Sequence, residues 1–346
     1  MRSFKLNGAI RILICDASNQ AIHFHMRQLV KDPNHVRLGM VGMVDGNGHP
    51  YSWSAIFNGF DKATMARCPY PAIPEYLNRQ PAAGFGIAGA HVTHVWCEDP
   101  KAARLVSKAS LVPNVMTEAT DLIGLVDAVI IATDRGEEHV SRARPFIEAG
   151  LPVFIDKPLT DNEADLRQFV RWHKQGNAIL STSCMRYSRE YADCLAKIAA
   201  IGELRLMTMT VSKSWERYGI HALEGVYPFL KPGGWREVAN TGTDAANVVH
   251  VHHASGVEVV LAAVSDMYGA FGCLNLYGTK GTLAGTFTDT FYAFKAQLEQ
   301  FIQYLRSGVP PFPFAETIEL TKIIIAGIRS RNESGRKVHL NDIKLD

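Results

Sequence analysis

Between residues 36 and 183, short apolar runs alternate with segments of helix length. The apolar runs cover residues 36–41, 92–96, 126–133, 151–155 and 178–183. The run 126–133 is almost wholly apolar, which is typical of a parallel strand that is buried on both faces. Strands that alternate with helices of about ten to fifteen residues predict a doubly wound parallel sheet. We therefore expect an α/β domain over residues 36–186.

The pattern changes after residue 186. Apolar runs at 204–213, 247–253, 257–263 and 271–276 are separated by turns such as Ser255-Gly256, which predicts a mainly antiparallel sheet. Two helices, 291–305 and 315–331, are predicted to pack on that sheet. Residues 187–346 are thus predicted to form an α+β domain. Residues 1–35 are predicted to be an N-terminal extension, and the Pro- and Gly-rich segment 61–90 an insertion.

Composition excludes several classes of protein. The chain has 346 residues, 47% of them hydrophobic, enough for two domains that each bury a core. A net charge of +2 without a long basic run argues against nucleic-acid or membrane-surface binding. The sequence contains no bilayer-length apolar stretch and no evident signal-peptide cleavage site, so we expect a cytoplasmic protein. Six scattered cysteines without a C-x-x-C pair indicate reduced thiols.

The predicted strand 151–155 ends in Asp156-Lys157-Pro158. Burying an unpaired ammonium is costly, so a lysine at this point needs a reason beyond packing. The carboxyl ends of parallel strands open onto the ligand crevice of such sheets. We therefore predict that Lys157 is catalytic and that Pro158 fixes the backbone that aims it. The alternative is a surface lysine at a strand-to-loop turn.

A glycine-rich turn follows the first predicted strand of this domain. Gly42, Gly46 and Gly48 lie between that strand and a helix predicted over 51–60, where glycines let a pyrophosphate approach a helix N-terminus. Their spacing is G-x-x-x-G-x-G rather than G-x-G-x-x-G, which makes the motif weak. Asp99, after the second strand, is predicted to hold a ribose hydroxyl, to cap the helix 100–109, or to do both. Its carboxylate favours NAD, whereas Lys101 nearby leaves NADP open.

Three histidines, His250, His252 and His253, lie on one predicted strand. The first two share a face and the third points to the other. Because no Cys, Asp or Glu completes a ligand set at a usual spacing, we predict exposed sheet histidines and no metal site. His23 and His25 in the extension are interpreted in the same way.

Several motifs found together resemble the glucose–fructose oxidoreductase / inositol dehydrogenase (Gfo/Idh/MocA) family. The run Asp127–Thr133, then His139, then the strand into Asp156-Lys157-Pro158 is similar to the family's succession that ends in Glu-Lys-Pro. Gly219–Glu224 resembles its substrate-domain pattern Asp-x-Gly-x-His-x-x-Asp. The resemblance covers roughly residues 36–346. The sequence departs from the family pattern in three places. Its glycines are respaced, Asp156 replaces the glutamate of Glu-Lys-Pro, and Arg217 replaces the first aspartate of the second pattern.

The resemblance implies a Rossmann domain and an NAD- or NADP-dependent oxidation of a secondary alcohol of a sugar, inositol or related carbohydrate. Lys157 and His221 would then lie at the reacting hydroxyl, with His221 as an acid or base because imidazole titrates near neutral pH. We expect the cofactor to contact Gly42, Gly46, Asn47, Gly48, Asp99, Thr133, Asp134, His139 and Asp156, and the substrate to contact Arg186, Arg217 and Tyr218.

Each of the two arginines has an alternative predicted role. Arg217 would bind an acidic group of the substrate through its guanidinium, or pair with Glu224 or Glu216. Arg186 would either reach the crevice or form a salt bridge that links the two domains. The resemblance further implies a homo-dimer or homo-tetramer formed through the second sheet. The respaced glycines and Arg217 also motivate an alternative function, a non-catalytic sensor that binds a cofactor or sugar.

Overall fold

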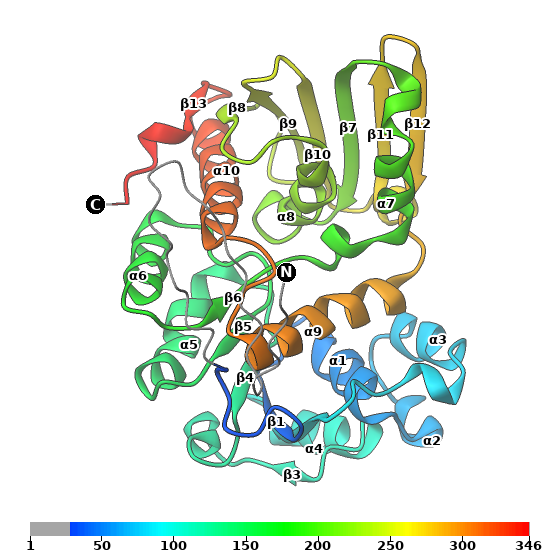
Figure 1. The fold of residues 1–346 in the computed structure, drawn as a ribbon, viewed down its shortest axis with the longest axis vertical. Helices are drawn as coiled ribbons and strands as arrows, with labels where there is room; N and C mark the ends of the chain where they lie inside the picture. The colour runs from blue at the N-terminus through cyan, green and yellow to red at the C-terminus, as the bar shows by residue number, and fades with distance from the viewer. Residues whose placement is uncertain (1–27, 346) are drawn as a thin grey trace, which may run out of the picture.

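The computed structural model describes residues 28–345, which form two sheets with helices around them (Figure 1). His23 and His25 of the predicted extension lie outside this range. Among the described residues, no helix combines the length and the apolar composition needed to cross a membrane.

The first sheet has six parallel strands in the order β3-β2-β1-β4-β5-β6. This order reverses direction between β1 and β4, as in a doubly wound Rossmann sheet, and confirms the predicted fold class. The reversal matters because ligands bind beside the carboxyl ends of the strands at such a point. The strands are β1 Val36–Val41, β2 Ala90–Trp96, β3 Asn114–Val115, β4 Ala128–Ile131, β5 Val153–Ile155 and β6 Ile179–Leu180.

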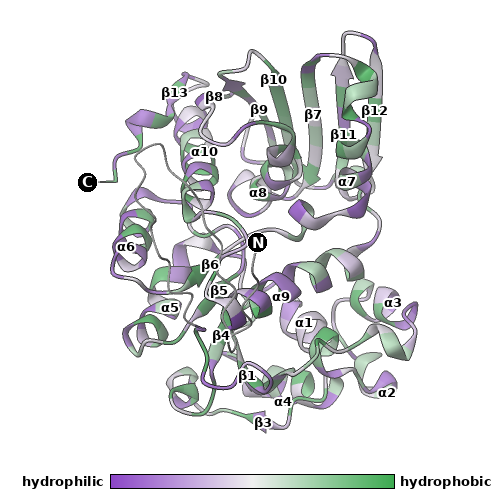
Figure 2. Ribbon diagram, viewed as in Figure 1, coloured by the Kyte–Doolittle hydropathy of each residue, from purple (hydrophilic) through white to green (hydrophobic). Residues whose placement is uncertain are grey.

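Helices cover both faces of this sheet. In β4, Ala128 and Ile130 pack in one core, whereas Val129 and Ile131 pack in the other, because successive side chains of a strand point to opposite faces. Both faces of the central strands are therefore apolar (Figure 2). The covering helices are α1 His49–Asn58 and α4 Pro100–Ala109 on one face, and α5 His139–Glu148 and α6 Glu163–Lys174 on the other.

The second sheet has seven strands in the order β12-β11-β7-β10-β9-β8-β13. All its pairs are antiparallel except β7 with β10, so the predicted mainly antiparallel sheet is confirmed. Strands β8, β12 and β13 were not predicted. The strands are β7 Leu204–Ser212, β8 Trp235–Asn240, β9 Ala246–His253, β10 Glu258–Val264, β11 Cys273–Gly278, β12 Gly281–Thr286 and β13 Val338–His339.

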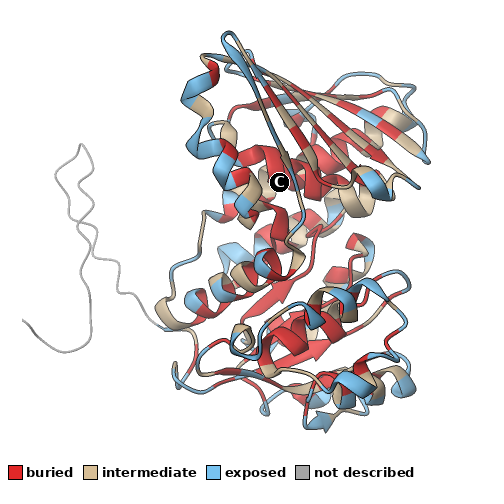
Figure 3. Ribbon diagram, turned by 90° about the vertical axis from the view of Figure 1, so that its right-hand side faces the viewer, coloured by how far each residue is buried: buried red, intermediate tan, exposed pale blue. Residues whose placement is uncertain are grey.

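One face of this second sheet is covered by helices and the other carries partly exposed side chains. Along β9 and β10, buried residues alternate with intermediate or exposed ones (Figure 3). The buried residues pack on α8 Trp215–Val226 and α10 Phe314–Asn332, while α7 Arg189–Ala196 lies beside β12. The remaining face has no helix from the described part of the chain.

Helix α9, Thr290–Ser307, does not pack on the second sheet as predicted. It returns to the first sheet, where Phe301 lies 5.5 Å from Phe154 and Phe294 lies 5.8 Å from Trp53 between ring centroids. Apolar periodicity predicts that a helix buries one face but not which sheet receives it. The chain beyond residue 186 therefore contributes to the core of both sheets. We keep the division at residue 186 as a proposal, since it falls between the last strand of one sheet and the first of the other.

The segment 61–90 is also more than the insertion predicted. It forms α2 Lys62–Met65 and α3 Ala72–Asn78, and both Met65 and Leu77 are fully buried against the first sheet's helices. A Cβ on Gly48 would lie 2.3 Å from a Tyr70 ring carbon and 2.6 Å from the Ile73 side chain. The segment thus closes the glycine-rich turn from one side.

We predict that Phe301→Ala lowers the free energy of unfolding by about 3–5 kcal/mol, the usual cost of removing a buried aromatic ring. Phe301 is fully buried, whereas Gln303 on the same helix is exposed. Urea unfolding followed by tryptophan fluorescence measures the change, with Gln303→Ala as the control. Equal midpoints for the two variants would show that α9 does not pack on the first sheet.

Candidate active site

A buried carboxylate, Asp134, lies directly after β4 at the centre of the site. One of its oxygens accepts a hydrogen bond of 2.6 Å from Nη2 of Arg217, and the other lies 3.7 Å from Nζ of Lys157. Burial raises the pKa of this carboxyl, but the positive charges of Lys157 and Arg217 prevail and lower it to about 2. Asp134 is therefore ionised and joins the first sheet to α8.

Lys157 lies just after β5, as the sequence predicted, and its ammonium faces Asp134 and Tyr218. Its side chain is only 2% exposed, which excludes the alternative of a surface lysine. The ammonium lies 4.4 Å from the centroid of the Tyr218 ring. The peptide bond between Lys157 and Pro158 is cis. The ammonium is thus held by an aromatic face and by the carboxylate of Asp134.

Helix α8 supplies the opposite wall of the site. Ser214 caps its first turn by accepting from the backbone N–H of Arg217. Arg217 and His221 are four residues apart and Tyr218 is beside the first, so all three occupy one side of the helix. The predicted site residues on this helix are thereby brought to the end of β5. Among them, Tyr218 and His221 have ring centroids 4.8 Å apart.

His221 is buried, and its Nδ1 lies 2.7 Å from Oγ of Ser183. Burial, and then the positive charge of Lys157, lower its pKa well below the usual value. The imidazole is therefore neutral near pH 7 and able to accept a proton. Ser183 lies just after β6 and also accepts from the backbone N–H of Met185.

Two cations of the second domain reach the glycine-rich turn of the first. Nη2 of Arg217 donates to the carbonyl of Asp45 over 3.1 Å, and Nζ of Lys213 donates to that of Gly46 over 2.9 Å. Burial, and then repulsion by Lys157, lower the pKa of Lys213 to about 8. Sequence reasoning missed Lys213 because a lysine just after a strand of the second sheet has no motif around it.

The predicted pairing of Arg217 with Glu224 or Glu216 is wrong. Glu216 pairs with Arg331 over 2.5 Å, and Glu224 pairs with Arg186. The unpredicted partner, Asp134, lies 83 residues away and could not be found from local spacing.

Arg186 forms the domain-linking salt bridge that was one of its two predicted roles. It pairs with Glu224 of α8 and, over 2.7 Å, with Glu316 of α10. Its guanidinium also lies 4.1 Å from the Phe312 ring centroid and 5.0 Å from that of Tyr227. Because these groups surround it, we no longer expect Arg186 to contact the substrate.

Asp156 connects β5 to the glycine-rich turn. Its Oδ2 accepts from Nδ2 of Asn47 over 3.1 Å and lies 2.6 Å from Nδ1 of His49, while its Oδ1 accepts from the Lys157 backbone N–H over 2.8 Å. The ring of His49 stacks on Trp53 at 4.3 Å. The predicted cofactor residues Asn47 and Asp156 are thus bonded to each other. His49 was missed because it lies just past the glycines that drew attention to this turn.

His139 does not have the position expected of a cofactor ligand. It is fully buried, and its two ring nitrogens lie 2.8 Å from the carbonyl oxygen of Thr133 and 3.1 Å from that of Leu159. It therefore joins the loops that follow β4 and β5 and leaves no nitrogen for a ligand. The hydroxyl of Thr133, by contrast, is buried without a hydrogen-bond partner.

Glu98, rather than the predicted Asp99, faces the glycine-rich turn. Glu98 accepts from the Met43 backbone N–H over 3.0 Å and pairs with Arg142, whereas Asp99 caps α4 by accepting from the Lys101 N–H over 2.8 Å. The predicted capping role of Asp99 is therefore confirmed, and Glu98 is the neighbouring carboxylate that contacts the glycine-rich turn. Glu98 and Arg142 line a cavity of about 380 Å³ together with Val41, Trp96, Glu138 and Pro145.

These residues fit a dinucleotide. The cavity lies where the strand order reverses, and Gly42 has φ +83° with a hypothetical Cβ only 2.7 Å from Cγ2 of Thr133, so nothing larger than glycine fits there. Glu98 would hold the adenosine ribose and the turn 42–48 the pyrophosphate. The unpartnered hydroxyl of Thr133 is available to the nicotinamide end.

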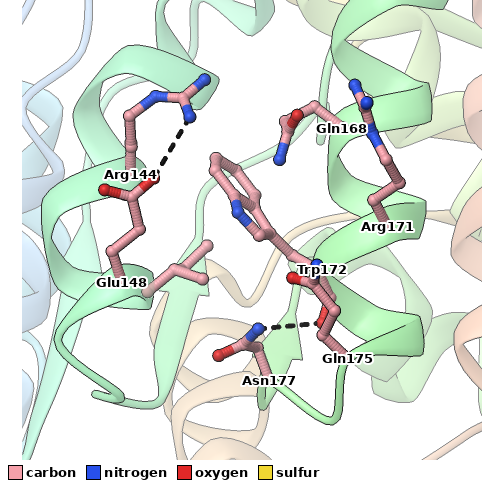
Figure 4. A pocket seen from close by; sticks show the side chains of 8 residues that line it. Arg144, Glu148, Gln168, Arg171, Trp172, Gln175 and Asn177 are labelled. Atoms are coloured by element: carbon pink, nitrogen blue, oxygen red, sulfur yellow. Dashed lines mark hydrogen bonds and ion pairs between the residues drawn. The ribbon is translucent and has the colours of Figure 1, made fainter.

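Another cavity, of about 470 Å³, lies between α5 and α6 (Figure 4). Its Arg144 lies 5.2 Å from the ring centroid of Trp172 and pairs with Glu148 over 3.2 Å. The helices end there, just before β5 and β6 begin, so this cavity borders the amino ends of the strands. Ligands of doubly wound sheets bind at the opposite edge, and we assign it no role.

The N-terminal sheet matches a known family. Residues 36–183 match the Gfo/Idh/MocA model, described as an oxidoreductase family with an NAD-binding Rossmann fold. An inositol 2-dehydrogenase from Corynebacterium glutamicum (strain R) is 35% identical over 122 residues, which are 34% of this chain and 35% of that protein. The match therefore spans about a third of the length of this curated relative.

Solved structures share the fold over most of both chains. Apo scyllo-inositol dehydrogenase from Lactobacillus casei superposes with a TM-score of 0.69 at 15% identity, covering 89% of this chain and 99% of that one. Myo-inositol dehydrogenase from Corynebacterium glutamicum ATCC 13032 gives 0.66 at 16%, covering 89% and 99%. An oxidoreductase from Agrobacterium radiobacter in complex with NAD+, L-tartaric acid and magnesium gives 0.70 at 13%, covering 90% and 100%.

At these identities the structural likeness concerns the fold. The matched segment contains β1 to β6, the glycine-rich turn and Lys157. Over residues 36–183 the chain therefore matches the Gfo/Idh/MocA oxidoreductase family, with its NAD-binding Rossmann fold.

Proposed function

We propose that this protein is an NAD-dependent dehydrogenase that oxidises a secondary alcohol of an inositol, sugar or related carbohydrate. The observation that carries the proposal is the meeting of Lys157, which follows β5, and His221, which lies on α8, in a buried site beside the glycine-rich turn. The similarity to proteins described as inositol dehydrogenases supports the substrate class.

The reaction requires a proton to leave the hydroxyl oxygen while a hydride leaves the carbon, and bound NAD accepts that hydride. We assign the proton to His221, whose lowered pKa keeps it neutral and ready to accept. If its Nδ1–H donates to Ser183, Nε2 is the free acceptor. The ammonium of Lys157 orients the hydroxyl and stabilises negative charge that develops on its oxygen.

We favour a neutral polyol over an acidic substrate. The guanidinium of Arg217 already pairs with Asp134, so it does not need a substrate carboxylate to balance its charge. The family pattern has an aspartate at the position of Arg217 on α8. In this chain Asp134, in the loop after β4, supplies a carboxylate there instead. We also propose a homo-dimer or homo-tetramer that forms through the helix-free face of the second sheet, on which Val248 and Tyr277 are exposed.

We predict that Lys157→Met and His221→Ala each lower turnover at least about 100-fold, the lower bound for losing acid–base catalysis. NADH affinity should stay within about threefold, because neither residue belongs to the phosphate-binding turn. Turnover is measured by NADH absorbance with a panel of inositols and sugars. Lys101→Met, at the exposed start of α4, is the control.

The same panel separates an enzyme from the alternative, a non-catalytic sensor. Tight NADH binding by fluorescence without turnover on any polyol or sugar would favour the sensor. Wild-type turnover in either variant would refute the assignment of that residue.

A second prediction concerns the choice between NAD and NADP. In Glu98→Gln the negative charge beside the ribose is lost and Arg142 is released from its ion pair with Glu98, so it can pair with a 2′-phosphate. We expect the ratio of the Kd values for NADPH and NADH to fall by about 10-fold or more. Asp99→Asn is a matched control because it removes the neighbouring carboxylate and keeps a good helix cap. An equal fall in the control would contradict the assignment to Glu98.

A third prediction uses the lowered pKa of Lys213, about 8. Above that pH the free protein loses a positive charge beside Gly46, whereas the bound pyrophosphate favours the charged form. NADH affinity should therefore be constant below pH 7 and fall by up to about 10-fold per pH unit above pH 8. Fluorescence titrations between pH 6 and pH 10 measure this, and Lys213→Gln should abolish the fall. The same pH dependence in the variant would show that another group titrates.

A further inference from the structure

A cluster of metal-ligating side chains lies on the helix-free face of the second sheet. His250 and His252 are two residues apart on β9 and point to the same face, and the register of β9 with β10 places Glu258 opposite His252. Nε2 of His250 lies 2.5 Å from Oε2 of Glu258, and Nδ1 of His252 lies 3.4 Å from the same oxygen. The sequence showed no acidic residue at a usual ligand spacing from these histidines, because the carboxylate comes from the neighbouring strand.

We propose that His250, His252 and Glu258 bind one divalent first-row transition-metal ion of the zinc type. The three ligand atoms lie within 4.8 Å of one another. Ligand atoms around a tetrahedral zinc ion with bonds of about 2.0–2.1 Å are about 3.3 Å apart, so the carboxylate needs only a small shift away from His250. Two imidazoles and one carboxylate leave the fourth position to water.

A second carboxylate supports the site from behind. Nε2 of His252, the nitrogen that does not face Glu258, lies 3.5 Å from Oε1 of Glu237 on β8. Metal-bound histidines usually direct their other ring nitrogen at a carboxylate, which fixes the ring and the tautomer. Glu237 is itself held by Nζ of Lys337 over 2.6 Å, and this hydrogen bond lowers its pKa. The surroundings thus resemble a supported ligand set more than a chance pair of surface histidines.

The donor atoms define the class of ion. Imidazole nitrogens with one carboxylate oxygen suit zinc, cobalt, nickel or copper, whereas magnesium and calcium prefer oxygen ligands only. The site lies on the face of the sheet turned away from α8, because Val249 and Val251, which alternate with its two histidines along β9, are buried in the core. It is therefore distinct from the proposed active site, and the inference does not depend on the proposed function.

The test is a titration of the full-length chain, without an affinity tag, with Co²⁺ followed by its visible absorption and with Zn²⁺ by calorimetry. We expect one saturable ion per chain, displacement of Co²⁺ by Zn²⁺ and no competition from Mg²⁺. His250→Ala and Glu258→Gln should each abolish saturable binding. Glu237→Gln should weaken Zn²⁺ binding by about 10–100-fold without abolishing it, as expected for a residue that supports a ligand.

His91→Ala is the matched control, since it removes an exposed histidine from a strand of the other sheet. Circular dichroism checks that each variant is folded. If an alanine variant does not fold, the conservative variants Glu258→Gln and Glu237→Gln still test the proposal. The absence of saturable binding to the wild-type chain would overturn the proposal. Binding that survives unchanged in both His250→Ala and Glu258→Gln would overturn it as well, by placing the ion elsewhere.

Discussion

The ion pairs of Asp134 are the interaction on which the candidate site depends. A carboxylate buried to this extent needs charged partners, because removing one partner of a buried pair typically costs about 3–5 kcal/mol. Its partners come from β5 and α8, so one side chain joins both sheets. Its pKa of about 2, against 3.8 for a free side chain, corresponds to about 2 kcal/mol of stability. That stability is present above about pH 4 and is lost as the pH falls toward 2.

Further contacts fix the position of the two sheets. Arg186 pairs with carboxylates of α8 and α10, and α9 crosses back to bury Phe301 against the first sheet. Salt bridges and an apolar helix contact therefore both connect the two parts of the chain. This combination holds α8 close enough for Lys213 and Arg217 to reach the glycine-rich turn.

The electrostatics of the crevice follow from the arrangement of charges around Tyr218. The ammonium groups of Lys157 and Lys213 lie 4.4 and 4.2 Å from its ring centroid. An aromatic face attracts a cation, so the ring helps Asp134 to hold these two positive charges in place. Burial, and then the charge of Lys157, lower the pKa of His221 and keep it neutral, which a proton acceptor requires. A negatively charged cofactor and a developing alkoxide are both favoured in such a site.

The sequence by itself determined the doubly wound sheet, the position of Lys157 at a strand end and the resemblance of residues 36–183 to a known oxidoreductase family. Those properties depend on local patterns, namely apolar periodicity and short motifs, which a linear sequence records directly. It also placed His221 with Lys157, although only through the resemblance to a family pattern.

Only the tertiary structure decided which side chains meet. The partner of Arg217, the choice of Glu98 over Asp99, the return of α9 to the first sheet and the addition of Glu258 to the histidines of β9 all depend on contacts between distant segments. Local spacing has no access to such contacts, because sheet register and helix docking are set by the packing of the whole core.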